Sequence, residues 1–147
     1  MDMVWIVLAV GAGACLALQA SANASLRGNL ADPRYAAFFS ICGTIVTAIV
    51  VMLFLRPSPP SLNAIRSAPW WNWIGGPLGA LIVLAGAALT PKLGAAAFIA
   101  AMVGGQLFCS LLLDHFGFMN VPQQGLTLGR LTGAMMVFAG VVLVKYW

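Results

Sequence analysis

The stretch "PKLGAAAFIAAMVGGQLFCSLLLDHFG" at residues 91–117 decides the fold class. After its proline and lysine it continues as a long run of apolar and small side chains, and its first acidic residue is Asp114. A helix needs about 20 mainly apolar residues to cross the hydrocarbon core of a bilayer. Backbone groups in lipid must be satisfied within such a segment, which excludes an irregular loop. The stretch therefore predicts a membrane-spanning helix, which we place at 93–115.

The composition extends this prediction to the whole chain. Its 147 residues are 62% hydrophobic and only 7% charged, with a mean hydropathy of +0.99. A soluble domain carries roughly 25% charged residues, so this chain cannot cover a water-facing surface. We expect an all-α membrane protein with one transmembrane domain over residues 1–147. Its five spanning helices are predicted at 4–25, 34–55, 70–90, 93–115 and 129–146.

The breaks between these segments have the chemistry of loops. The stretch "RPSPPSLN" at 56–63 is rich in proline, which cannot continue a helix, and "FMNVPQQG" at 118–125 forms the fourth loop. Pro91-Lys92 predicts a very short turn, which makes helices three and four a tight antiparallel hairpin. The tryptophans at 70, 71 and 73 fit an aromatic belt at the membrane surface. Residues 4–24 resemble a signal peptide ending in "ANA", but Asp2 and the lack of Lys or Arg at the amino end favour a retained helix.

The basic residues do not favour either orientation in the membrane. They form no basic run, which argues against nucleic acid as a partner. Three of them fall on the side of the N-terminus and four on the other, so the usual excess of Lys and Arg in cytoplasmic loops is missing. A weak bias set by other details is one interpretation. The other is dual topology, in which two copies insert both ways round and pair as an antiparallel homodimer. Two copies of five helices would form the inverted repeat common in secondary transporters. A parallel dimer or a paralogue partner remains an alternative.

Polar side chains inside the helices are the candidates for a site. Serine and threonine hydroxyls often bond to the carbonyl four residues earlier, whereas a glutamine amide needs a partner helix or a wet cavity. Gln19 and Gln106 therefore serve either as interhelical glue or as substrate contacts, and Gln106 lies near the middle of its helix. The candidate substrate-binding residues are Gln19, Asn23, Thr44, Gln106 and Ser110.

The charged residues lie near helix ends. Asp114 and Arg130 fall on the same side of the membrane, where an ion pair would tie down the fourth loop in a structural or gating role. An intramembrane carboxylate can instead bind a proton or a cation. No Asp, Glu, Lys or Arg is predicted at mid-membrane depth. Proton-coupled cation exporters rely on such a carboxylate, so we expect a neutral, zwitterionic or organic anionic substrate.

Small residues at a spacing of four indicate close helix packing. The glycines expected at helix contacts are Gly75, Gly79, Gly94, Gly104, Gly129 and Gly133.

The sequence predicts no metal site, no cofactor and no enzyme. Cys15, Cys42 and Cys109 are interpreted as small buried residues, and His115 is the single histidine, so the ligands of a metal site are missing. No nucleophile–base pair or carboxylate dyad suggests an enzyme.

The chain resembles the YdcZ-like family of five-helix membrane proteins, a branch of the drug/metabolite transporter superfamily. The resemblance rests on "LQASANASL" in helix one, "WWNWIGGPLGA" in helix three, the helix-four stretch at 91–117 and "RLTGAMMVFAGVVL" in helix five. It implies half of a ten-helix inverted-repeat transporter in the bacterial cytoplasmic membrane, completed by dimerisation or by a paired paralogue. It supplies no substrate.

Two functions follow from these expectations. The first is a secondary transporter of a small polar metabolite, with a site near the membrane midplane between inverted copies. The second is a non-transporting membrane subunit or half-transporter, whose polar side chains hold a different membrane protein.

Overall fold

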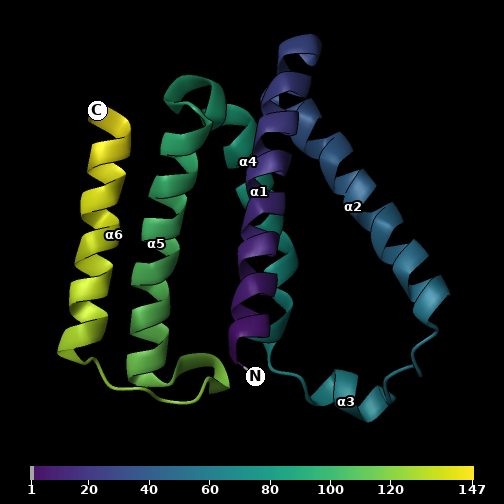
Figure 1. Cartoon of the computed structure of the whole chain (residues 1–147). Helices are drawn as coiled ribbons and strands as arrows, with labels where there is room; N and C mark the ends of the chain where they lie inside the picture. Colours follow the sequence, from purple (N-terminus) through teal and green to yellow (C-terminus); the bar gives the residue numbers. More distant parts are fainter. Residues whose placement is uncertain (1) are drawn as a thin grey trace. The chain divides into compact units, whose positions relative to one another are not determined.

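The structure is a computed structural model that describes residues 2–147, and it is all-α (Figure 1). Five of the described helical segments are long and apolar enough to cross a membrane, as predicted. The elements in chain order are α1 (Asp2–Leu30), α2 (Pro33–Leu55), α3 (Leu62–Ser67), η1 (Trp70–Trp73), α4 (Gly75–Leu93), α5 (Ala95–Phe116), η2 (Phe118–Asn120) and α6 (Leu128–Tyr146).

The first helix is longer than predicted, and the loop after it is shorter. α1 continues to Leu30 instead of ending at 25, because residues 26–30 contain no proline that would interrupt it. α2 then begins with Pro33 at its first turn, where the missing N–H costs nothing. Asp32 caps this helix by accepting a hydrogen bond from the backbone N–H of Arg34 at 2.8 Å.

The second loop contains a short helix that the sequence analysis missed. α3 starts directly after the prolines, at the point where Ser61 caps it by accepting from the backbone N–H of Ala64 at 3.2 Å. The signal for this helix was a serine followed by a proline-free stretch. The third spanning segment likewise begins with a 3-10 turn, η1, before α4 starts at Gly75.

The predicted turn at Pro91-Lys92 is wrong. Both residues lie inside α4, which runs to Leu93, and Gly94 alone separates α4 from α5. Pro91 stands near the end of the helix and removes one N–H donor there without stopping it. Gly94 can form this connection because its φ of 85° is a conformation that a residue with a Cβ rarely adopts.

The described chain divides into two compact units, which we describe separately. One contains the chain up to Ala17 together with Leu89–Trp147, and the other contains Leu18–Ala88. Within the first, α5 and α6 lie side by side (Figure 1). A Cβ on Gly104 would lie 3.4 Å from both Phe138 and Val141 of α6, so the absent side chain lets these helices pack together.

The other predicted packing glycines have no such neighbour among residues 2–147. A Cβ would meet nothing within 4 Å at Gly75, Gly79, Gly94 and Gly133, and on Gly129 it would meet only Thr127 of its own helix cap, at 4.0 Å. A packing role for these five glycines stays a prediction.

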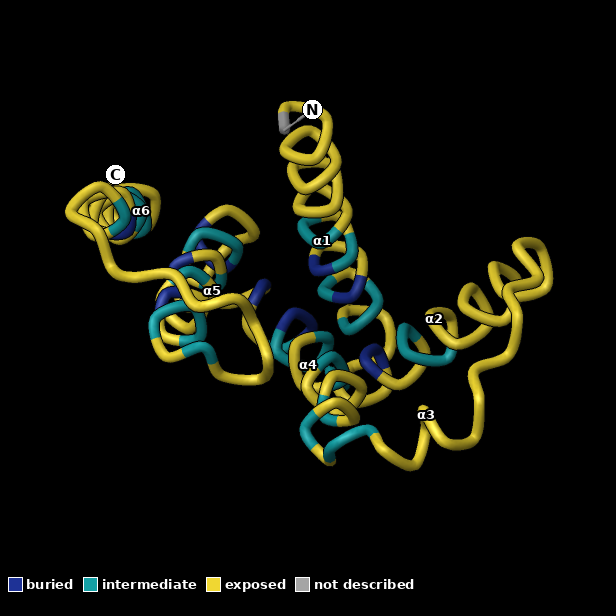
Figure 2. Tube along the Cα trace, turned by 90° about the horizontal axis from the view of Figure 1, so that it is seen from below, coloured by how far each residue is buried: buried dark blue, intermediate teal, exposed yellow. Residues whose placement is uncertain are grey.

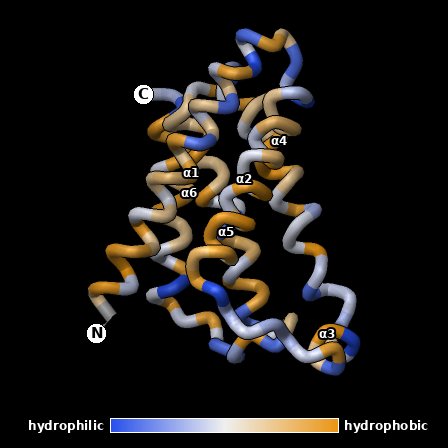
Figure 3. Tube along the Cα trace, turned by 90° about the vertical axis from the view of Figure 1, so that its right-hand side faces the viewer, coloured by the Kyte–Doolittle hydropathy of each residue, from blue (hydrophilic) through white to orange (hydrophobic). Residues whose placement is uncertain are grey.

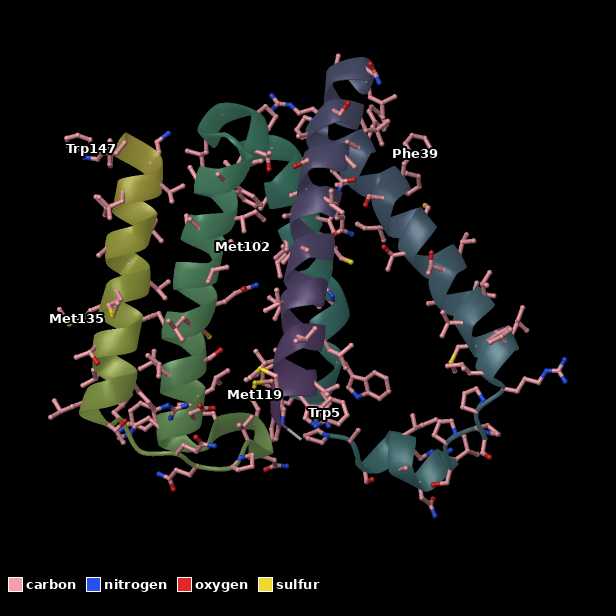
Figure 4. All side chains as sticks on the ribbon, viewed as in Figure 1. Trp5, Phe39, Met102, Met119, Met135 and Trp147 are labelled. Atoms are coloured by element: carbon pink, nitrogen blue, oxygen red, sulfur yellow. The ribbon has the colours of Figure 1, made fainter. Side chains whose placement is uncertain are left out.

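Apolar side chains cover the outside of the helices, as lipid requires. In α2 the buried residues are Ala36 and Ala37, near its start, and Figure 2 shows most of this helix as exposed. Hydrophilic residues instead concentrate in connecting segments such as α3 (Figure 3). Met135 illustrates the apolar exterior, because its exposed side chain points from α6 away from α5 (Figure 4).

Candidate functional site

The middle of α5 presents an amide on the side opposite to its packed face. Gly104 faces α6, and two residues along a helix turn the side chain by about 200°. Gln106 therefore points away from α6, as does Met102 one turn earlier (Figure 4). The Gln106 side chain is exposed, and no hydrogen bond joins it to another part of the described chain. A primary amide in this state needs a partner when the helix stands in lipid.

The hydroxyl candidates differ from one another. Thr44 donates to the carbonyl of Ser40 at 3.1 Å, and Thr47 donates to that of Gly43 at 2.9 Å, so their own helix satisfies both. Ser110 forms no bond of this kind among the described residues, and it is exposed on α5, one turn after Gln106. Thr44 is therefore the weaker of these two candidates.

A second set of polar side chains follows α1 in the unit Leu18–Ala88. Gln19 is half-buried, and Asn23, one turn later, is only 5% exposed. Arg27 is the next residue at the same stride, and its Nη1 donates to the carbonyl oxygen of Ala88 in α4 at 3.2 Å. Arg27 lies beyond the predicted end of the first helix at 25, although its spacing of four from Asn23 was a signal that it shares this face.

The end of α5 is tied to the start of α6 by an ion pair. Nη2 of Arg130 donates to Oδ2 of Asp114, and the two side chains are 29% and 23% exposed. Nη1 of Arg130 also donates to the carbonyl oxygen of Gln124 at 3.3 Å. The role of this pair, structural or gating, stays a prediction.

Two glutamines of the fourth loop complete this connection. The backbone N–H of Gln124 donates to the carbonyl oxygen of Asp114 at 2.8 Å, and Nε2 of Gln123 donates to that of His115 at 2.8 Å. These bonds satisfy carbonyls that the end of α5 leaves free. Sequence reasoning missed both residues, because only the folded loop brings them back to the helix.

The candidates thus fall into two groups. Gln106, Ser110 and the Asp114–Arg130 pair belong to α5 and α6, whereas Gln19, Asn23 and Thr44 belong to the unit Leu18–Ala88. Within the first group, the structure brings Asp114 and Arg130 into contact.

Five apolar spans with polar side chains set into them are the features of a multi-pass membrane protein. The comparisons with known proteins give its family. Residues 4–143 match the family described as "Putative inner membrane exporter, YdcZ". The chain is also 33% identical over 100 residues to "Inner membrane protein YdcZ" of Escherichia coli (strain K12). That match covers 68% of this chain and 66% of the relative, just under two thirds of its length. No solved structure matches the chain.

The chain belongs to the YdcZ family of inner membrane proteins. It is a multi-pass protein of the bacterial inner membrane. These findings confirm the predicted family, location and five-helix class.

Proposed function

We propose that the chain is one half of a secondary transporter of a small polar metabolite, completed by a second copy in the opposite orientation. The site lies near the membrane midplane, between the two copies, and alternating access moves the solute across. Gln106 of each copy is the principal substrate-facing group, and Gln19, in the unit Leu18–Ala88, is a second candidate for substrate contact.

The observation that carries this proposal is the unpartnered amide of Gln106. It stands near the middle of a spanning helix, on the face that does not pack against α6, and it is exposed. Leaving such a group in hydrocarbon costs several kcal/mol, so a solute, water or a second chain must meet it. The acidic residue of α5, Asp114, is by contrast already paired with Arg130 of α6.

Two further features support the antiparallel arrangement. The basic residues divide three against four between the two sides, so neither orientation is strongly favoured. An odd number of spans places the two ends of each copy on opposite sides, which allows two inverted copies to complete each other.

The test is solute flux into liposomes that contain the purified protein, with a panel of amino acids, organic anions, sugars and organic cations. We expect Gln106→Ala to abolish flux while cross-linking still detects the dimer. Gln124→Ala is the matched control, because it removes the same amide from the fourth loop and should leave flux unchanged.

Loss of the dimer in Gln106→Ala would favour the alternative function, in which the amide holds a membrane partner. Exchange of protons for an organic cation would contradict the expected substrate class. If the wild-type protein moved none of the solutes, the transporter proposal would fail.

A further inference from the structure

We infer that Arg27 and Asn23 of α1 form a binding subsite for an oxyanion group, a carboxylate or a phosphate, at one end of the membrane. The inference rests on the proposed function and narrows its substrate class from small polar metabolites to small organic anions.

The first step is the charge of Arg27, which lacks an acidic partner. Its guanidinium is partly buried, and the described part of the chain offers it no ion pair. One donor reaches the carbonyl oxygen of Ala88. A guanidinium has five N–H donors arranged as a fork that fits a carboxylate or a phosphate, so most of its capacity is unused.

The nearest acidic residue is already engaged. Asp32 binds Arg34 instead, through bonds of 2.6 Å and 3.0 Å from the Arg34 guanidinium to Oδ2 and one of 3.1 Å to Oδ1. These bonds, with smaller contributions from the charges of Arg34 and Arg27, hold the pKa of Asp32 below its ordinary value of 3.8. The Asp32 carboxylate therefore stays charged and paired. Its negative charge offsets one of the two arginines, Arg34 and Arg27, and one positive charge remains at this end of α1 and α2.

Asn23 supplies a second, independent observation. It lies one turn before Arg27 on the same face of α1, and it is only 5% exposed. No hydrogen bond joins its side-chain amide to another residue of the described chain. A nearly buried amide without a protein partner has two donors to offer a ligand.

The position of Arg27 at the end of α1 strengthens the interaction of its positive charge with an anion. Arg27 stands in the last turn of α1, where the partial negative charge of the helix end stabilises a cation but fills none of its donors. An oxyanion that is out of bulk water interacts more strongly with such a guanidinium than a solvated one does. A neutral solute would leave the charge unmatched, and an organic cation would be repelled.

The experiment measures binding directly, so it does not depend on transport. Succinate and inorganic phosphate are titrated calorimetrically into the purified full chain in uncharged detergent. We expect the wild-type protein to bind at least one of them, Arg27→Gln to weaken that binding at least tenfold, and Arg27→Lys to retain part of it.

Two further variants show whether the effect belongs to this site. Asn23→Asp has nearly the same shape and places a carboxylate one turn from Arg27, so it should abolish anion binding without unfolding the chain. Arg66→Gln removes an equal charge from α3 in the second loop and should bind like the wild type. Circular dichroism verifies that each variant is folded.

A lipid headgroup carries the same chemistry as an anionic solute. The titration is therefore repeated in nanodiscs of phosphatidylcholine, with and without phosphatidylglycerol. Succinate binding that survives the anionic lipid supports a solute subsite. Displacement by phosphatidylglycerol that depends on Arg27 would instead assign the group to lipid and overturn the substrate class.

The inference fails if neither anion binds the wild-type protein, or if Arg27→Gln binds as well as the wild type. Failure of the proposed function has a different result, because binding would then be intact while liposomes show no flux of any solute. Flux of neutral solutes without anion binding would keep the proposed function and overturn the inference.

Discussion

At Gly104, a hydrogen atom in place of a side chain decides how closely α5 and α6 can approach. The Cβ positions of neighbouring Gly105 and of Gly133 on α6 have open space around them. The sequence shows all three as equivalent small residues at helical spacing. Only the position of Phe138 and Val141 distinguishes Gly104 from the others.

Gly104→Leu should therefore destabilise the protein by about 1–3 kcal/mol, since a side chain there must displace Phe138 and Val141. Thermal unfolding in detergent measures the effect as a lower Tm. Gly105→Leu is the matched control on the same helix and should change Tm little. Equal effects of the two substitutions would contradict the packing described.

The Asp114–Arg130 pair is a second feature at the residue scale. Asp114→Ala leaves the partly buried guanidinium of Arg130 without its carboxylate, and we expect a loss of about 1–2 kcal/mol in the free energy of unfolding. The charge-swapped double variant Asp114→Arg with Arg130→Asp should recover part of this loss. If the double variant is no more stable than the single ones, the pair is not what connects the helices. Flux by the single variants tests the gating role separately.

At the scale of elements, each connection is determined by its capping residues. Asp32 and Ser61 begin α2 and α3, and Gly94 allows α5 to follow α4 after a single residue. Asp32 is the most informative of these because its cap is also titratable.

The Asp32 cap predicts a defined dependence on pH. The bonds from Arg34 lower the pKa of Asp32 in the folded protein below 3.8, so the stabilisation is complete above pH 3.8 and is lost as the pH falls through the folded pKa. We expect Tm of the wild type to fall more steeply on acidification from pH 5 to pH 3 than that of Asp32→Asn. At pH 7, Asp32→Ala should lower Tm more than Asp32→Asn, which keeps a capping oxygen. If Tm falls equally with pH in the wild type and in Asp32→Asn, the Asp32 carboxylate does not cause the pH dependence.

At the scale of the whole molecule, the charge balance predicts dual topology. Single cysteines at Ser58 and Asn29 report on the two sides, on a background in which the three native cysteines are replaced. On the second side we choose Asn29, near the first connection, as the labelling position. The third connection consists of Gly94 alone, so it offers no loop residue for a cysteine. Each cysteine should react with a membrane-impermeant reagent from both sides of the membrane. Strictly one-sided labelling would refute the antiparallel homodimer.

The sequence by itself determined the lipid solvent, the five spans and the family, because long apolar runs have one physical solution in a bilayer. It placed the start of α2 within one residue, at 34 where the structure has Pro33, but not the third turn, where Pro91 is tolerated near a helix end and Gly94 has a positive φ. The sequence also suggested the Asp114–Arg130 ion pair, which the structure contains. Only the tertiary structure decided that Arg27 reaches a carbonyl of α4 and that Gln106 meets no partner in the described chain. The reason is that a hydrogen bond depends on distances between groups of different elements, and spacing along one helix does not specify them.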